Sequence, residues 1–155
     1  ILLGYKAGVL DEAEVQLEPD KNVFSNDAKI APEIDLELIN KLREVVGGAQ
    51  PDGHDAAFRE MGLTIGQLAH RLAVPEYKVR QAINQGMNYR NFNDFLNSYR
   101  IRDASQRLAR VSDSHLPVLT IALDAGFRSL SSFNKAFKAE FQITPTAYRK
   151  QNLAD

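Results

Sequence analysis

The feature of this 155-residue sequence that most constrains its fold is an internal repeat. Five pairs of equivalent positions carry it, 53 residues apart before a turn and 54 after it: Leu68 and Ile121, Ala69 and Ala122, Ala73 and Gly126, Val79 and Phe133, Ile83 and Phe137. Each copy has a helix, a tight turn of small residues and a second helix. The repeat therefore predicts two helix-turn-helix units, at 64–86 and 118–141.

Apolar periodicity predicts an all-α fold, since no alternating apolar run is long enough for a convincing strand. Thr64 and Asn91 are suited to cap helices, and Pro75 suits a first helical turn. The expected helices span 36–46, 56–61 (capped by Asp55), 65–72, 75–85, 91–110, 118–125, 129–141 and 145–150. The helix at 91–110 joins the two units and is roughly 30 Å long at about 1.5 Å per residue.

The predicted domain organisation is an acidic linker or arm at 1–34, accessory helices at 35–61, the two-unit domain at 62–150 and a tail at 151–155. The first accessory helix has an apolar stripe made of Leu36, Ile39, Leu42, Val45 and Val46. This stripe either packs on the following domain or pairs with a second copy of the chain. Its short length favours the first alternative.

The formal charge of −1 is the sum of two segments of opposite sign. Residues 1–62 carry 6 basic and 13 acidic side chains, a net of −7, whereas residues 63–150 carry 13 basic and 6 acidic ones, a net of +7. A basic segment favours a polyanionic partner such as nucleic acid, although charges that only solvate helix surfaces give the same count. Two units joined by this helix would meet successive major grooves, about 34 Å apart on one face of a duplex.

Several classes of site have no candidate in the sequence. There is no cysteine, which excludes disulfides, thiolate metal sites and thiol nucleophiles. His54, His70 and His115 are scattered, and there is no glycine-rich phosphate loop and no nucleophile motif. We therefore predict no catalytic residue, no metal site and no cofactor, in a chain that is not an enzyme. No apolar run approaches the roughly 18 residues of a membrane span.

A specific motif runs through the second unit and into the helix after it. Its positions are Gly126, Phe127, Arg128, Ser129, Phe133, Phe137, Lys138, Phe141 and the run Thr144 to Arg149. Upstream, a helix segment carries Phe95 to Arg102 with Ala104 and Leu108. Together these segments resemble the signature and the linker helix of the AraC/XylS transcription regulators. The resemblance covers 62–150 and implies seven helices in two helix-turn-helix subdomains that bind double-stranded DNA sequence-specifically.

The sequence departs from that family at its turns. Ala73 stands where the family usually has Gly, and Ile83 stands where Phe is usual. Val74-Pro75 occupies a place where a capping Ser is common, and Gln142 replaces a frequent Gly. These departures bear on local turn geometry more than on the fold.

Three further segments, Val74 to Arg80, Ile83 to Gly86 and Tyr89 to Asn93, resemble a subgroup of the family whose members carry membrane helices before this domain. The opening Ile1 to Lys6 is similar to the end of such a region. The chain also starts without Met, so we expect it to be part of a longer protein. The resemblance implies the bacterial cytoplasm, at the nucleoid, and a tether at the inner membrane in the full-length protein.

Helix phase predicts which side chains face DNA. With Val79 and Ile83 inward in the first unit, and Phe133 and Phe137 inward in the second, the opposite faces carry the candidates for base reading. These candidates are Glu76, Tyr77, Arg80, Gln81, Leu130, Ser131, Asn134 and Lys135. Arg80 would contact guanine, Lys135 guanine or a phosphate, and the amides of Gln81 or Asn134 adenine, each base contact worth about 1–3 kcal/mol of discrimination. The plainer alternative is a solvated helix surface, and Leu130 would either touch a thymine methyl or pack.

Phosphate contacts are expected from residues at helix starts and from nearby basic side chains, namely Lys78, Arg90, Asn91, Arg128, Ser129 and Ser132. Ser129 is equally suited to be only a cap. Tyr148 and Arg149 are expected to pack and to clamp the last helix. The phenylalanines of the second unit are expected to form its core.

The expected partners are double-stranded DNA and RNA polymerase, with a homodimer formed through the N-terminal region. The rival hypothesis is a protein-interaction or signal-relay module. In it the acidic arm or the stripe at 36–46 docks a sensor or polymerase, and DNA contact is secondary. Salt separates the two hypotheses, because an affinity that depends on phosphate neutralisation falls steeply as salt rises.

Overall fold

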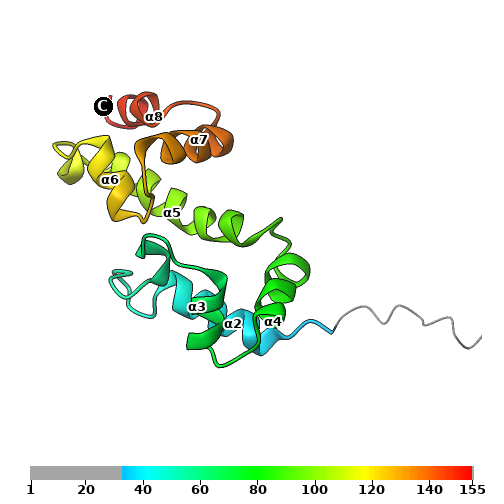
Figure 1. The fold of residues 1–155 in the computed structure, drawn as a ribbon. Helices are drawn as coiled ribbons and strands as arrows, with labels where there is room; N and C mark the ends of the chain where they lie inside the picture. Colours follow the sequence, from blue (N-terminus) through cyan, green and yellow to red (C-terminus); the bar gives the residue numbers. More distant parts are fainter. Residues whose placement is uncertain (1–32, 155) are drawn as a thin grey trace, which may run out of the picture. The chain divides into compact units, whose positions relative to one another are not determined.

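A computed structural model describes residues 33–154, and within that range the chain forms helices and no β-strand (Figure 1). The seven α-helices are α2 (Leu36–Gly47), α3 (Ile65–Arg71), α4 (Glu76–Gln81), α5 (Phe92–Leu108), α6 (Val118–Asp124), α7 (Leu130–Phe141) and α8 (Pro145–Asn152). Two 3₁₀ turns, η2 (Ala57–Arg59) and η4 (Val111–Asp113), and a π-helical turn, η3 (Ala82–Gly86), join them. The predicted all-α class is confirmed, while residues 1–32 of the predicted arm lie outside the described part.

Two hydrophobic cores lie along α5, which runs between the two units in Figure 1. Phe95 and Leu96 of α5 are buried in the first core, with residues of α2, α3 and α4. One to three turns further on, Ile101, Ala104 and Leu108 are buried in the second, with residues of α6 and α7. The linker helix is thus part of both cores.

Aromatic rings fill the second core, as predicted. Phe127, Phe133, Phe137 and Phe141 form a chain of ring contacts, with successive centroids 5.1, 5.5 and 4.7 Å apart. Tyr148 of α8 closes the chain at 5.3 Å from Phe137 and 4.8 Å from Phe141. These rings are core and not a platform for stacking bases.

The accessory helix α2 packs on its own domain, which confirms the favoured alternative. Its buried side chains are Leu38, Ile39, Leu42 and Val46. Leu36 was expected in this stripe but is 68% exposed, and Leu38 takes its place. The two leucines lie on opposite flanks of the stripe, and only the flank of Leu38 meets the rest of the domain.

Asp55 does not cap a helix at 56–61, contrary to the prediction. Its carboxylate accepts hydrogen bonds from the backbone N–H groups of Ala49 (3.1 Å) and Gln50 (3.2 Å) and so closes the loop after α2. These bonds hold the pKa of Asp55 below its ordinary value. The segment that follows has no side-chain cap and forms only the short turn η2.

Other boundaries also differ from the prediction. The helix expected at 75–85 changes to the π-helical turn η3 at Ala82. The helix expected to reach 110 ends at Leu108, so α5 is about 25 Å long. The turn η4 then forms at the start of what was expected to be a loop.

Both positions where the family resemblance expects glycine have a left-handed backbone. Ala73 has φ of 55° and Gln142 has φ of 65°, and Gly126, the repeat equivalent of Ala73, has φ of 106°. A residue with a Cβ in this region costs about 1–2 kcal/mol. The turn at Ala73 therefore keeps a left-handed residue and stores strain.

We expect Ala73→Gly to raise the free energy of unfolding by about 0.5–1 kcal/mol. Relief of the left-handed strain, about 1–2 kcal/mol, exceeds the added entropy of the unfolded chain, about 0.4–1 kcal/mol. Urea denaturation measures the change. Ala109→Gly, at a position with φ of −87°, is the matched control and should lower stability. If Ala73→Gly were no more stable than the parent, the assigned strain would be wrong.

Candidate nucleic-acid interface

The first recognition helix, α4, has the phase predicted for it. Val79 is fully buried and Ile83, in the π-helical turn that continues α4, is 1% exposed. On the opposite face, Glu76, Tyr77, Lys78 and Arg80 are all exposed, whereas Gln81 is half-buried. Four of the five candidates on this helix are therefore exposed, and Gln81 is only partly accessible.

An ion pair lies on the exposed surface of α4. The Arg80 guanidinium donates to Glu76 Oε1 at 2.7 Å, across one turn of the helix. Both side chains are about half exposed, so the pair contributes little to stability. A carboxylate that holds Arg80 would compete with any base or phosphate for the same guanidinium.

The second recognition helix, α7, presents its candidates without such a pair. Phe133 and Phe137 are fully buried, and Leu130 is 38% exposed. Ser131, Asn134 and Lys135 are exposed, and none of the three makes a side-chain hydrogen bond with another described residue. Their polar groups are thus available to an external partner.

The helix starts show which candidates for phosphate binding are already engaged. Ser129 Oγ accepts from the backbone N–H of Ser132 at 3.1 Å, and the Ser132 hydroxyl donates to the Ser129 carbonyl at 3.0 Å. Asn91 Oδ1 accepts from the backbone N–H of Asp94 at 2.8 Å. Ser129 and Asn91 therefore serve as helix caps, which is one of the two alternatives stated for Ser129.

The basic candidates near these caps differ in their surroundings. Arg90 donates to Asp94 Oδ2 at 3.0 Å and is still 84% exposed. Lys78 is exposed on α4. Arg128 is exposed as well, but its guanidinium lies against the backbone of Gly62. Arg149 clamps the last helix, as predicted, by donating to the Leu116 carbonyl at 2.7 Å.

Sequence reasoning missed a buried arginine between the two cores. Arg100 is 9% exposed and donates to two backbone carbonyls, Phe58 O at 2.8 Å and Glu60 O at 3.0 Å. Burial, and to a lesser degree the charge of Arg128, lower its pKa. One signal was available, because Arg100 follows the buried Leu96 by one helical turn and so falls on the inward face of α5.

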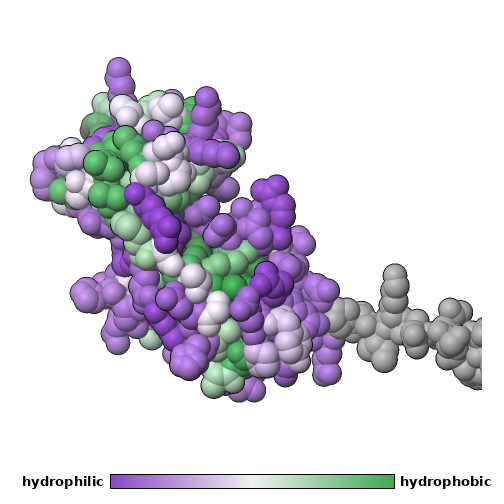
Figure 2. Space-filling model, in the orientation of Figure 1, coloured by the Kyte–Doolittle hydropathy of each residue, from purple (hydrophilic) through white to green (hydrophobic). Residues whose placement is uncertain are grey.

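The surface has two further features relevant to binding. A groove of about 610 Å³ lies between α5 and α7, and its charged lining is balanced: Arg90, Arg102, Asp94 and Glu140. Apolar surface gathers over the part of the chain that contains α6 in the view of Figure 2, where Leu119 and Leu123 are 45% and 37% exposed. Within residues 33–154 no helix is long and apolar enough to cross a membrane, and no three His, Asp or Glu side chains are grouped to hold a metal ion.

Comparison with known proteins gives the family. A helix-turn-helix domain model of the AraC type matches residues 68–151, more than half of the chain. The chain belongs to the AraC-type helix-turn-helix family. DNA binding and transcription regulation are the functional class of this family, whose members are normally non-enzymatic.

Individual relatives agree with the family assignment. The HTH-type transcriptional regulator MtrA of Neisseria gonorrhoeae is 39% identical over 57 residues, which are 37% of this chain and 18% of that protein. The matched region is thus less than a fifth of MtrA.

Solved structures of two other proteins share the fold. The C-terminal domain of AraT, a response regulator from Geobacillus stearothermophilus, aligns with a TM-score of 0.61 at 24% identity, over 74% of this chain and 84% of that one. A transcriptional regulator from Chromobacterium violaceum, described as AraC-type, aligns with a TM-score of 0.52 at 22% identity, over 59% and 78%.

We expect Glu76→Gln to raise the affinity for nonspecific duplex DNA about two- to fivefold, because it removes a negative charge and releases Arg80. If Arg80 then contacts a phosphate, the slope of log affinity against log salt becomes steeper by about 0.9. A salt titration by fluorescence anisotropy measures both. Glu37→Gln breaks a similar pair with Lys41 on α2 and should change neither quantity. Unchanged affinity in Glu76→Gln would contradict a role for this face in DNA binding.

Proposed function

We propose that the chain is the DNA-reading part of a transcription regulator, with α4 and α7 in two successive major grooves of one operator. The observation that carries the proposal is the matched construction of these helices. Each has a pair of buried apolar residues on one face and exposed polar residues on the other. Each follows a short helix and a tight turn, as in a helix-turn-helix, and α5 joins the two units.

The proposed contacts follow from exposure and free hydrogen-bonding groups. Lys135 would bind guanine and Asn134 adenine, while Leu130 and Ser131 lie beside them on the same face. In the first unit Arg80 would read guanine after release from Glu76, with Tyr77 and Gln81 beside it. Lys78, Arg90 and Arg128 would bind phosphates, as would Ser132 once its hydroxyl leaves the Ser129 carbonyl, and the caps Ser129 and Asn91 would direct backbone N–H groups toward them.

The proposal also covers the domain bounds, the location in the cell and the partners of the chain. The DNA-binding domain would span 62–150, with 35–61 as accessory helices. We infer a nonenzymatic regulator at the nucleoid in the bacterial cytoplasm that contacts RNA polymerase. Dimerisation through the N-terminal region and an inner-membrane tether beyond this sequence belong to the same proposal.

One observation favours a second candidate function, the docking of a protein partner. Leu119 and Leu123 are one helical turn apart on α6 and both are partly exposed. Of the two surfaces that the sequence suggests for docking, the stripe does not support it, since Ile39, Leu42 and Val46 are buried in the chain's own domain, and residues 1–32 of the acidic arm lie outside the described part. Within the described residues, a docking function would use α6 and would accompany DNA binding.

Selection of the purified chain against random duplexes tests the proposed function. We expect enrichment of two short blocks about one helical turn apart, with an affinity that falls steeply between about 50 and 200 mM salt. Two working recognition helices require both blocks. A single enriched block would restrict base reading to one unit, and no enrichment would favour the docking function.

We expect Lys135→Ala to lower the affinity for the selected duplex and to relax the preference at one base position, by about 1–3 kcal/mol. Lys150→Ala, which removes an exposed lysine of α8, should leave that preference unchanged. Competition with single-base variants of the duplex measures the effect. A uniform loss over all variants would instead make Lys135 a phosphate contact.

A further inference from the structure

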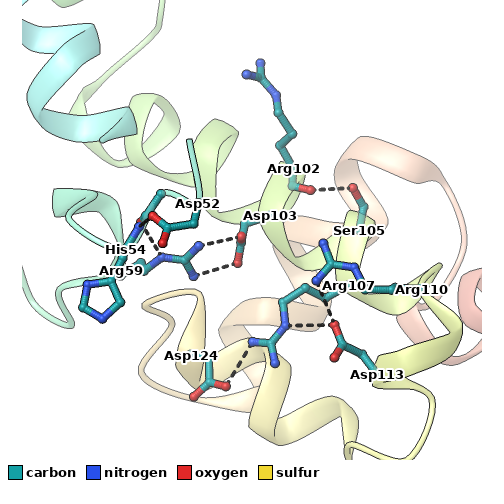
Figure 3. A network of polar contacts seen from close by, with 11 residues as sticks. Asp52, His54, Arg59, Arg102, Asp103, Ser105, Arg107, Arg110, Asp113 and Asp124 are labelled. Carbon is teal, nitrogen blue, oxygen red and sulfur yellow. Dashed lines mark hydrogen bonds and ion pairs between the residues drawn. The ribbon is translucent and has the colours of Figure 1, made fainter. Parts of the chain in front are cut away.

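The segment Gly53–Gly62, here called the wedge, joins the two halves of the structure. It lies between α2 and α3 in sequence and contains η2. Arg59 of the wedge reaches α5 and makes two parallel hydrogen bonds to Asp103, at 3.0 and 2.8 Å (Figure 3). Its Nε donates to the Gly53 carbonyl at 3.0 Å. Arg59 thus links Gly53, the first residue of the wedge, to Asp103 of the linker helix.

The Arg59–Asp103 pair is well shielded from water, since the two side chains are 27% and 16% exposed. Arg100, one turn earlier on α5, donates to the carbonyls of Phe58 and Glu60 in the same wedge. Two arginines therefore fix the wedge on α5, one from each side of the contact.

The turn of the second unit, at Gly126, packs against Arg100 and the wedge. A Cβ at Gly126 would lie 2.8 Å from Arg100 Nε and closer still to the Phe58 carbonyl oxygen. Phe127, the next residue, has its ring centroid 5.9 Å from the Arg100 guanidinium. Arg128 lies against Gly62 at the other end of the wedge. The wedge therefore contacts both α5 and the turn that precedes the second recognition helix.

These contacts constrain the angle between the units. A change of one base pair between two half-sites moves the second by about 3.4 Å along the axis and rotates it by about 35°. A pair of helices held at one angle cannot follow that change, whereas units joined only by α5 could swing apart. Contacts that join the wedge both to α5 and to the Gly126 turn would oppose such a swing.

We propose that Arg59 and Asp103 are positioning residues that set the spacing of the two half-sites accepted by the chain. The proposal rests on the proposed function, because it requires both recognition helices to read DNA. Neither residue contacts DNA in it. Their ion pair holds the wedge between α5 and the Gly126 turn, and the wedge holds the orientation of α7 relative to α4.

The first test measures binding to duplexes with the selected half-sites at the preferred spacing and at one base pair less or more. We expect the parent to prefer its spacing by about tenfold or more, and Arg59→Met, which keeps an apolar stem but removes the fork, to lose most of that preference. Exchange of the charges, Arg59→Asp with Asp103→Arg, should restore part of it. Thermal melting by circular dichroism checks that each variant is folded.

Arg71→Met is the matched control. Arg71 also forms a two-bonded pair, with Glu60 of the wedge, but this pair joins the wedge to α3 within the first unit. The preferred spacing should survive its loss. An unchanged spacing preference in a folded Arg59→Met variant would overturn the inference and leave the proposed function intact.

The second test needs no DNA. The chain has no cysteine, so Asn84→Cys with Lys138→Cys gives two exposed sites for spin labels, one in the turn η3 after α4 and one in the last turn of α7. The distribution of label distances should be narrow in the parent and in Arg71→Met, and broad in Arg59→Met. Equal widths in all three would overturn the inference. A broad distribution in Arg59→Met, together with no enriched duplex for the parent, would support the geometry and reject the proposed function.

Discussion

The rest of the structure depends on the double role of α5, which buries side chains in two separate cores. Where one core ends and the other begins, the inward position is Arg100. A buried guanidinium is costly without partners, and here backbone carbonyls of the wedge supply them in place of a carboxylate. Arg100 of the linker helix therefore contacts both the wedge and the turn of the second unit.

The sequence predicts those parts of the fold that depend on local pattern. Two helix-turn-helix units follow from apolar spacing, and the caps Thr64, Asn91 and Ser129 follow from residue type at helix starts. The long-range contacts do not follow. Arg59 and Asp103 are 44 residues apart, and no periodicity indicates that their side chains meet. The burial of Leu38 in place of Leu36 could not be predicted for the same reason. It depends on a long-range contact, namely which flank of α2 another segment covers.

In the candidate interface, too, the sequence predicts local features but not all contacts between side chains. Helix phase correctly predicts that the polar faces of α4 and α7 are exposed, since two buried residues fix the rotation of a helix. Phase does not tell which polar groups are free. Arg80 and Lys135 are both exposed base-reading candidates, yet only Arg80 is paired with a carboxylate. The i,i+4 spacing of Glu76 and Arg80 was readable from the sequence, whereas the wedge that fixes α7 was not.

The two equivalent turn positions of the repeat differ in their freedom to vary. Ala73 is exposed, so a side chain there meets solvent and the only penalty is backbone strain. Gly126 is buried against the wedge, and any side chain would displace the Phe58 carbonyl. The turn of the first unit can therefore accept side chains that the turn of the second unit cannot, because the wedge closes the space around Gly126 alone.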